Sequence, residues 1–335
     1  MIQYMPMESK KALFFEVAAQ EAETLREAIA ADANLKGLQC EFLEQKLDAS
    51  GLTLASQADI VSVFINSVLD KGSIDKLAKT RLIATRSTGF DHIDLEAAKS
   101  KPVSVANVPA YGSHTVAEFA FALILGLSRK VFEASYKVKS GQGFSAAGMM
   151  GFDLYGKTIG IVGTGRIGQN VAVIAKGFGM KVIAYDPYPN NEAAKNIGFD
   201  YVSLDDLLSR SDIVTLHAPY NPGTKHLINM ENINRFKRGS LLVNTARGEL
   251  CDNEALLTGL DKGILGGVGL DVVEGERKLK DGEKVSTFEK LRAHPHAFVT
   301  PHMAYFTAEA QKEIARVTVE NISAFLRGEA KNVVS

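Results

Sequence analysis

A Gly-x-Gly-x-x-Gly motif in the middle of the chain constrains the fold more than any other feature. Its glycines are Gly163, Gly165 and Gly168, and the apolar, β-branched run 158–162 before them is typical of a buried strand. In a strand–turn–helix unit the first glycine permits the tight turn and the second lets the backbone approach a pyrophosphate. The third allows the helix to pack closely on the sheet. The motif therefore predicts a dinucleotide-binding unit.

The residues after the motif support this interpretation. Val171, Ile174 and Phe178 recur at helical spacing, and a second apolar run, 181–185, ends at Asp186. An acid about 20 residues beyond the glycines is where a carboxylate accepts hydrogen bonds from ribose hydroxyls. The alternative, a glycine-rich turn that binds nothing, does not account for these flanks.

Composition sets broad limits on the protein. Its 335 residues suffice for about two domains. A hydrophobic content of 46% and a net charge of -1 are those of an ordinary globular protein with no nucleic-acid footprint. Cys40 and Cys251 offer no disulfide framework and fit a reducing compartment. The longest apolar run, 119–127, is shorter than the ~20 residues of a membrane span. We expect a cytoplasmic protein with no nucleic-acid or membrane partner.

Short apolar runs alternate with amphipathic segments along the chain, which predicts parallel sheets covered on both faces. The expected strands are 13–18, 40–43, 60–64, 82–85, 158–162, 181–185, 213–217, 241–246, 267–272 and 298–300. The expected helices are 21–31, 75–79, 113–131, 230–236, 253–260 and 308–325, and residues 141–151 read as a loop.

The position of the dinucleotide motif suggests how the domains are connected. Because it lies in mid-chain, we expect residues 110–305 to form an NAD-binding Rossmann domain inserted into another domain. Residues 1–109 together with 306–335 would form the substrate-binding, catalytic domain. The expected fold class is α/β, with two Rossmann-like or flavodoxin-like parallel-sheet domains and a cleft between them. Catalysis would lie in that cleft, at the carboxyl ends of the strands.

Three strand ends carry residues suited to chemistry. Arg247 follows a buried strand, where its planar guanidinium could bind a carboxylate in bidentate fashion or form an ion pair with one of the chain's own acids. Glu274 and Glu276 follow another strand, where a solvated acidic loop is the alternative. His302 follows a Thr-Pro strand end and is the candidate acid–base residue.

A metal site is the competing interpretation of this histidine. His294 and His296 could join His302, but no carboxylate or cysteine ligand stands at metal-binding spacing. We therefore expect no metal.

Several motifs follow one another along the chain: Ser87-Thr-Gly-Phe-Asp-His-Ile-Asp94, Gly163-Thr-Gly-Arg-Ile-Gly168, Asn244-Thr-Ala-Arg-Gly248, Leu270-Asp-Val-Val-Glu-Gly-Glu276 and Thr300-Pro-His302. In this order they resemble the D-isomer-specific 2-hydroxyacid dehydrogenase family, and the resemblance runs from about Leu82 to the C-terminus. The resemblance implies that Arg247 binds the substrate carboxylate and that His302 transfers the proton. It also implies that an acid pairs with the histidine, and the family spacing selects Glu276 over Glu274.

The resemblance extends to the ligand-contact positions. It implies substrate contacts at Thr88, Gly89, Tyr111, Arg247 and Tyr305. It implies contacts with NAD at Gly163, Gly165, Arg166, Ile167, Gly168, Asp186, His217, Ala218, Pro219, Thr224, Thr245, Ala246, Asp271 and Ala304. Asp186 would repel the 2′-phosphate of NADP, so NAD is the expected cofactor. In the family the region of helix 113–131 pairs two subunits, so we expect a homodimer.

Two segments resemble the D-lactate dehydrogenase branch in particular. They are Val108-Pro-Ala-Tyr-Gly-Ser113 and Pro301-His-Met-Ala-Tyr-Phe-Thr307, whose aromatic residues would close the pocket together with Phe64. The expected reaction is reversible reduction of a 2-oxo acid by NADH, with pyruvate as the first candidate. Hydroxypyruvate, phenylpyruvate, 2-oxoisocaproate and phosphoglycerate-type substrates stay open, as does an NADH-sensing corepressor. The lysine-rich segment 277–296 departs from the family pattern, so the sequence does not predict the shape of the loop that it forms.

Overall fold

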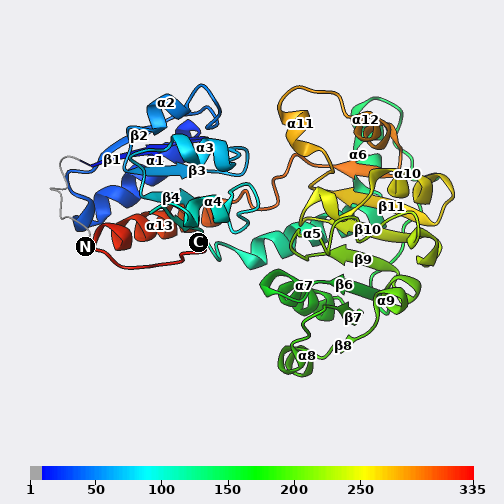
Figure 1. Cartoon of the computed structure of the whole chain (residues 1–335). Coiled ribbons are helices and arrows are strands. Elements are labelled where there is room, and N and C mark those ends of the chain that lie inside the picture. The colour runs from blue at the N-terminus through cyan, green and yellow to red at the C-terminus, as the bar shows by residue number, and fades with distance from the viewer. Residues whose placement is uncertain (1–9) are drawn as a thin grey trace. The chain divides into compact units, whose positions relative to one another are not determined.

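The computed structural model describes residues 10–335 and divides the chain into two compact units. The chain leaves the first unit after Gly112 and returns to it at Phe306 (Figure 1). The inserted unit is Ser113–Tyr305. Each unit is built on a parallel sheet, as the strand–helix alternation predicted.

The first unit contains a five-stranded sheet in the order β2-β1-β3-β4-β5. Its strands, all parallel, are β1 (Lys11–Phe14), β2 (Gln39–Phe42), β3 (Ile60–Val63), β4 (Leu82–Thr85) and β5 (Ser104–Ala106). Successive side chains of β1 enter different cores: Leu13 faces one cluster, whereas Ala12 and Phe14 face the other. This alternation follows from the strand period of two and requires cover on both faces.

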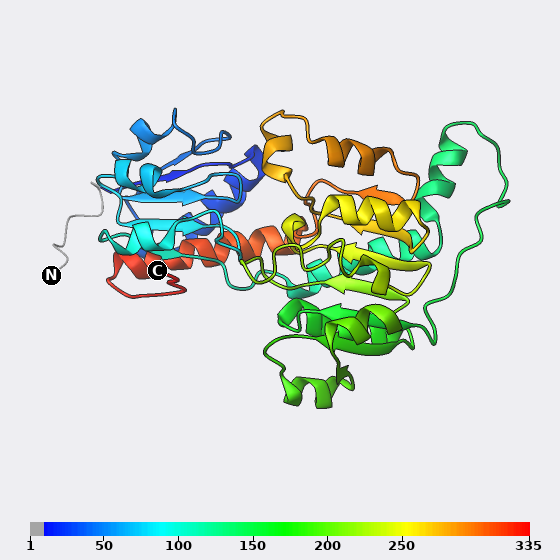
Figure 2. The same ribbon diagram turned by 45° about the vertical axis from the view of Figure 1, so that its right-hand side comes forward.

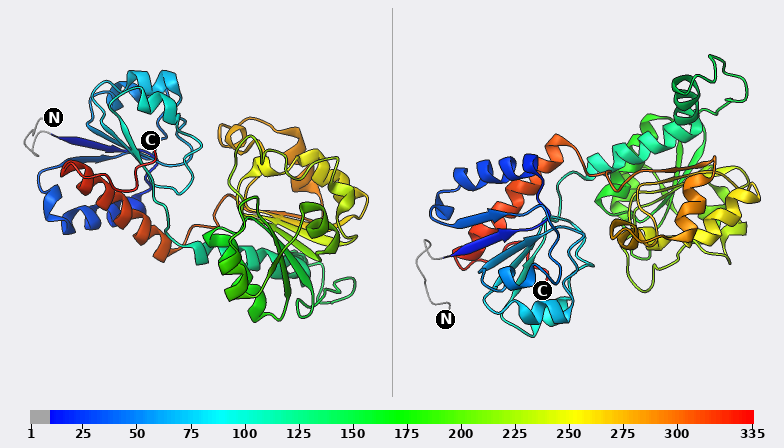
Figure 3. Two further views of the ribbon diagram at one scale, coloured as in Figure 1. Left: turned by 60° about the horizontal axis from the view of Figure 1, so that its bottom comes forward. Right: turned by 90° about the horizontal axis from the view of Figure 1, so that it is seen from above.

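Helices supply that cover. On one face α1 (Ala19–Ala31) lies beside α13 (Ala308–Leu326), so the C-terminal helix packs in the first unit (Figure 3). The other face is covered by α2 (Leu52–Ala55), α3 (Lys71–Lys76) and α4 (Leu95–Lys99). The loops after β1, β3 and β4 therefore meet at one edge, because the carboxyl ends of parallel strands lie on the same side of a sheet.

The inserted unit contains a seven-stranded parallel sheet in the order β12-β11-β10-β9-β6-β7-β8. Its strands are β6 (Thr158–Val162), β7 (Lys181–Tyr185), β8 (Asp200–Tyr201), β9 (Ile213–Leu216), β10 (Ser240–Asn244), β11 (Leu265–Leu270) and β12 (Ala297–Val299). The chain starts at β6, adds β7 and β8 on one side, and returns to add β9 on the other. The order reverses between β6 and β9, and such a switch point is where open α/β sheets bind ligands.

Helices cover both faces of this sheet as well. The helices of the unit are α5 (Ser113–Ser128), α6 (Val131–Lys139), α7 (Arg166–Gly177), α8 (Asn191–Ile197), α9 (Leu204–Arg210), α10 (Asn253–Asp261), α11 (Glu276–Lys280) and α12 (Ser286–Ala293). One core contains residues of α5 and α7, and the other contains residues of α9, α10 and α12.

The expected helix 113–131 is wrong at its C-terminal end. α5 stops at Ser128, and a separate helix, α6, begins after Lys130, whose φ of 52° is left-handed. Phe132 folds back onto α5, since a Cβ on Gly126 would meet its ring at 2.1 Å. Figure 2 shows α6 and the segment after it extending beyond the layers of the inserted unit.

The expected helix 230–236 is also wrong. Only a 3-10 turn, Ile233–Arg235, forms there. The Asn229 side chain accepts hydrogen bonds from the backbone N–H groups of Glu231 and Asn232, and the Asn232 side chain accepts one from Asn229. Such local bonds offer the backbone an alternative to the helix.

Candidate active site

The Gly-x-Gly-x-x-Gly motif joins β6 to α7 and has the geometry of a phosphate-binding turn. Gly163 has a φ of 91°, and a Cβ there would meet the Ala218 nitrogen at 2.6 Å. A Cβ on Gly168 would meet the Gly163 carbonyl oxygen at 2.0 Å, so this glycine lets α7 approach the sheet. A Cβ on Gly165 would meet no other part of residues 10–335 within 4 Å, and this residue precedes α7 as an N-cap without a side-chain hydrogen bond. The open side of Gly165 and the uncapped helix end fit a pyrophosphate.

Asp186, directly after β7, lies against this turn. Its carboxylate accepts hydrogen bonds from the Thr164 backbone nitrogen at 2.7 Å and from the Thr164 hydroxyl at 3.0 Å. It also accepts one from the backbone nitrogen of Tyr188 at 2.9 Å. The predicted ribose acceptor is thus held beside the predicted pyrophosphate turn, at the carboxyl end of the neighbouring strand.

The other expected cofactor positions, from His217 to Ala304, follow β9, β10, β11 and β12 at the same edge of the sheet. His217 and Thr245 there each carry a buried polar atom, Nδ1 and Oγ1 respectively, with no hydrogen-bond partner among the described residues. The His217 ring bonds the Thr215 hydroxyl through Nε2 at 2.9 Å, and burial lowers its pKa to about 3, which keeps it neutral. Buried polar atoms normally have partners, so these two groups fit the edge of a ligand site.

Three further expected cofactor positions have mainly local contacts. Thr224 donates from its hydroxyl to the Pro219 carbonyl at 2.7 Å and so closes the loop after β9. The Ala246 carbonyl accepts a hydrogen bond from the Arg247 guanidinium at 2.8 Å.

His302 and Glu276 form a close pair. The distance from Nδ1 of His302 to Oε1 of Glu276 is 2.8 Å, and both side chains are about four-fifths buried. Burial by itself raises the pKa of Glu276, but the hydrogen bonds and charges of His302 and Lys280 outweigh it and lower that pKa to about 2. Glu276 is therefore anionic at neutral pH. Since Nδ1 faces Glu276, Nε2 is the ring atom left for a substrate.

Lys280 is a member of this cluster that the sequence did not single out. It lies one turn beyond Glu276 on α11 and forms an ion pair with the same carboxylate oxygen as His302. The segment 277–296, whose shape the sequence left undefined, consists of α11, a connection and α12. An acid and a lysine four residues apart are the signal that could have found this pair, had a helix been expected there.

Asp271 shapes the turn that carries His302. Its buried carboxylate accepts hydrogen bonds from the Thr300 hydroxyl at 2.6 Å and from the backbone nitrogens of Met303 at 2.9 Å and Ala304 at 2.8 Å. His302 sits inside this turn with a left-handed φ of 53°, and its own N–H donates to the Asp271 carbonyl. Asp271, expected among cofactor contacts, thus holds the backbone of the candidate acid–base residue.

Glu274, the other acid considered as the partner of His302, contacts a different histidine. Its Oε1 lies 2.6 Å from Nε2 of His226, a histidine that the sequence reasoning missed. Gly275, between the two acids, has a φ of 82°. The two glutamates are therefore held by different histidines.

Arg247 follows β10, the strand next to β11. Its side chain is half-buried, and the Asn244 amide donates to its carbonyl at 2.8 Å. A Cβ on the following Gly248 would lie 2.0 Å from the Val273 carbonyl carbon, so this backbone passes directly beside the loop of Glu276. The carboxyl ends of β10, β11 and β12 thus bring Arg247, Glu276 and His302 to one edge.

The expected substrate contacts are divided between the units. Tyr305 lies next to His302 in the inserted unit, with ring centroids 6.4 Å apart and nearly perpendicular planes. Thr88 and Gly89 follow β4 in the first unit. The Thr88 hydroxyl donates to the Val108 carbonyl at 2.8 Å, and the Gly89 carbonyl accepts from the Ser87 hydroxyl at 2.6 Å. Tyr111 lies in the segment that leaves the first unit.

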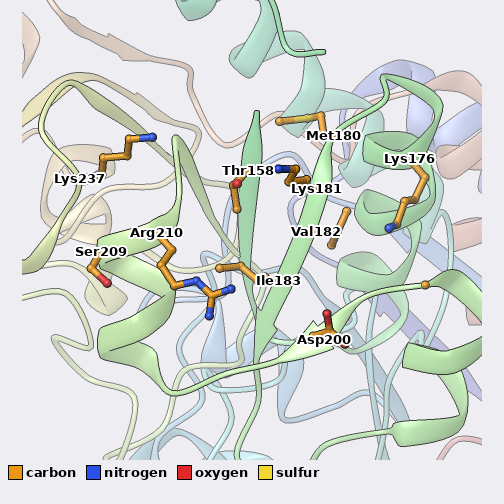
Figure 4. A pocket seen from close by; sticks show the side chains of 11 residues that line it. Thr158, Lys176, Met180, Lys181, Val182, Ile183, Asp200, Ser209, Arg210 and Lys237 are labelled. Atoms are coloured by element: carbon orange, nitrogen blue, oxygen red, sulfur yellow. The ribbon is translucent and has the colours of Figure 1, made fainter. Parts of the chain in front are cut away.

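A cavity of about 610 Å³ lies away from this edge, at the amino ends of β6 and β7 (Figure 4). Its cationic side chains include Lys176 and Arg210, which end α7 and α9, and Lys237, which pairs with Asp212 at 2.7 Å. Cations at helix C-terminal ends complement the helix dipole, which gives these residues a structural explanation.

No group of three or more His, Cys, Asp or Glu side chains within residues 10–335 could hold a metal ion. In the same range, no helix is both long and apolar enough to cross a membrane.

Comparison with known proteins agrees with the geometry. The profile of "D-isomer specific 2-hydroxyacid dehydrogenase, NAD binding domain" matches residues 121–304. The chain belongs to this family. D-lactate dehydrogenase kk1H of Curvularia clavata is 44% identical over 299 residues, which cover 87% of this chain and 85% of that protein. The aromatic 2-oxoacid reductase of Clostridium sporogenes is 38% identical over 289 residues, 83% of this chain and 86% of that one.

A solved structure gives the same result. D-lactate dehydrogenase from Aquifex aeolicus, complexed with NAD and lactic acid, superposes with a TM-score of 0.86 at 35% identity and covers 95% of this chain and 96% of that one. The protein is thus an NAD-dependent D-2-hydroxyacid dehydrogenase with two parallel-sheet α/β domains. The relatives' names differ in the acid that they specify, so family membership leaves the substrate open.

Proposed function

We propose that this dehydrogenase reduces pyruvate to D-lactate, with His302 as the proton donor. The observation that carries the proposal is the buried His302–Glu276 pair at the same sheet edge as Arg247. The residues Gly163, Gly165, Gly168 and Asp186 would hold NAD, which supplies or accepts the hydride when bound. The inserted unit would then be the NAD-binding domain, and the first unit the substrate-binding domain.

The side chains would divide the work as follows. Arg247 binds the substrate carboxylate with its planar guanidinium, together with backbone N–H groups near Gly89. This contact fixes the orientation of the carbonyl carbon. His302 donates the proton on Nε2 to the oxygen that develops negative charge, and takes it back in the reverse reaction. Glu276 accepts from Nδ1, holds the ring in place and stabilises its positive charge.

The choice of pyruvate depends on Tyr111 and Tyr305, whose sequence segments resemble those of the D-lactate dehydrogenase branch. Initial rates of NADH oxidation with pyruvate, phenylpyruvate, 2-oxoisocaproate, hydroxypyruvate and glyoxylate test this choice. A kcat/KM for another acid well above that for pyruvate would reassign the substrate and leave the site roles unchanged.

We also propose that the protein is a homodimer. Most apolar residues of α5 are buried in the core of their own unit, so they cannot contact a second subunit. Exposed apolar side chains instead gather on α6 and the segment after it: Val131, Phe132, Tyr136, Val138, Phe144 and Met150. An apolar surface of this kind suits a second copy in a symmetric contact. Sedimentation of a monomer at micromolar concentration would contradict this.

The corepressor alternative shares the fold and the Arg–Glu–His set, because a fold does not determine a function. The purified protein separates the two functions. Turnover of pyruvate with NADH supports the enzyme. Binding of NADH with no turnover of any acid in the panel supports the sensor.

A further inference from the structure

A polar cluster in the first unit lies at the edge that carries Thr88 and Gly89. Its central residue is Glu16, which directly follows β1 and has a left-handed φ of 58°. The Glu16 carboxylate accepts hydrogen bonds from the backbone nitrogens of Phe64 at 3.2 Å, Asn66 at 3.0 Å and Ser67 at 2.9 Å. One side chain thus binds most of the donors of the loop that follows β3.

Ser67 extends this contact to a second loop. Its side chain is fully buried; the hydroxyl donates to Glu16 and accepts from the backbone nitrogen of Leu47 at 2.8 Å. The backbone N–H of Glu16 donates to the Gln45 carbonyl at 2.9 Å. The loops after β1, β2 and β3 are therefore joined through Glu16.

Arg86, directly after β4, fixes the backbone of Glu16. It is the largest fully buried side chain of the described residues. Its guanidinium donates to the carbonyls of Phe15 at 2.7 Å and Glu16 at 2.9 Å, and to the Glu21 carboxylate at 2.7 Å. It also lies 6.0 Å from the centroid of the Phe64 ring.

This arrangement contains features that a fold alone does not require. A non-glycine residue in the left-handed region and a fully buried arginine each cost free energy and are found where the surroundings enforce them. Here the left-handed Glu16 and the buried Arg86 together fix the loop 64–67 at the carboxyl edge of the sheet. The neighbouring loop does not need them, because Thr88 and Gly89 are held by Val108 and Ser87.

We propose that Glu16 is a positioning residue: by fixing the loop 64–67, and with it the Phe64 ring, it shapes the contacts of the first unit with the 2-oxo acid. Glu16 would thereby set which 2-oxo acids are accepted. This inference rests on the proposed function, in which the first unit is the substrate-binding domain. Arg86 acts one step earlier, since it holds the backbone from which the Glu16 carboxylate reaches the loop.

Steady-state kinetics of Glu16→Gln with pyruvate and phenylpyruvate at saturating NADH test the proposal. The amide has a single acceptor oxygen, and its NH₂ group would face a backbone donor, so the loop is released. The ratio of kcat/KM for phenylpyruvate to that for pyruvate should rise about tenfold, the scale at which a pocket wall discriminates. The change should appear in KM, while kcat for pyruvate changes little, because His302 and Glu276 belong to the other unit.

Glu21→Gln is the matched control. It makes the same carboxylate-to-amide change in the same polar cluster and weakens a contact of Arg86, but leaves the bonds of the loop 64–67 in place. It should lower the melting temperature and leave the substrate ratio unchanged. Ser67→Ala removes one donor to Glu16 and should raise the ratio less than Glu16→Gln does, which decides the matter if Glu16→Gln fails to fold.

An unchanged ratio in active Glu16→Gln or Ser67→Ala protein would overturn the inference, as would an equal rise in Glu21→Gln. Failure of the proposed function is distinguishable, because it appears in the wild-type protein alone, as turnover of neither acid or as a preference for phenylpyruvate over pyruvate.

Discussion

Glu276→Gln should lower the rate of 2-oxo acid reduction without abolishing it. In the proposed function His302 is the proton donor, and the Glu276 carboxylate lies 2.8 Å from Nδ1 of its ring. A carboxylate in this position stabilises the positive charge of the ring, since an anion close to a cation favours its charged form. An amide in the same position keeps one hydrogen bond but loses the charge. The charged ring is therefore less stabilised in the variant.

The size of the effect follows from the contact. A hydrogen bond to a charged group contributes about 1.5–3 kcal/mol, and about 1.4 kcal/mol corresponds to a factor of ten in rate. Lys280 neutralises part of the Glu276 charge, and the pair is about one-fifth exposed, so the lower end applies. The kcat/KM for pyruvate reduction should therefore fall about tenfold. The assay is the initial rate of NADH oxidation as a function of pyruvate concentration.

Glu274→Gln is the matched control, because Glu274 contacts His226 rather than His302. Its kcat/KM should match that of the wild type. A fall in Glu274→Gln and none in Glu276→Gln would show that the wrong acid has been assigned to the proton donor. An equal fall in both variants would refute the electrostatic argument and leave only a structural role.

Three further substitutions test the remaining roles. His302→Ala should lower kcat by about 10²-fold or more while NADH titration by fluorescence shows unchanged binding; near-normal turnover would remove His302 as proton donor. Arg247→Lys should raise KM for pyruvate and lower kcat/KM by about 10²-fold, since lysine lacks the planar fork that aligns the carboxylate. A wild-type KM in that variant would rule Arg247 out as the carboxylate anchor. Asp186→Ala should narrow the preference for NADH over NADPH, and equal kcat/KM values for both cofactors in the wild-type protein would contradict its role.

The residues of the site that directly follow strands could be predicted from the sequence. A buried strand, a glycine turn and an acid at fixed spacing are local features, so β6, α7 and Asp186 could be placed directly. Arg247 and His302 each stand three residues after the end of a strand, and the carboxyl ends of parallel strands share an edge. That Glu276 rather than Glu274 lies at His302 came from the family spacing and agrees with the geometry.

Contacts that depend on the path of a loop could not be predicted from the sequence. The partner of Glu274 is His226, which lies 48 positions away in a segment expected to precede a helix. The break between α5 and α6 depends on Phe132 folding over Gly126, a tertiary contact that overrides the helical pattern of 113–131. Glu16 belongs to no sequence motif, because its contacts with the loop 64–67 depend on a left-handed backbone that sequence pattern does not reveal for a glutamate.

The position of Glu276 is fixed by contacts on both sides of its loop. On one side, Glu274 bonds His226, and the Glu274 carbonyl accepts from the Asn253 amide at 3.3 Å. On the other, Asp271 fixes the turn of His302 through its carboxylate. Gly275 allows the reversal between them, since its φ of 82° is one that an L side chain rarely adopts. The His302–Glu276 distance is therefore set by two anchored backbones rather than by two flexible side chains, which is the preorganisation that proton transfer requires.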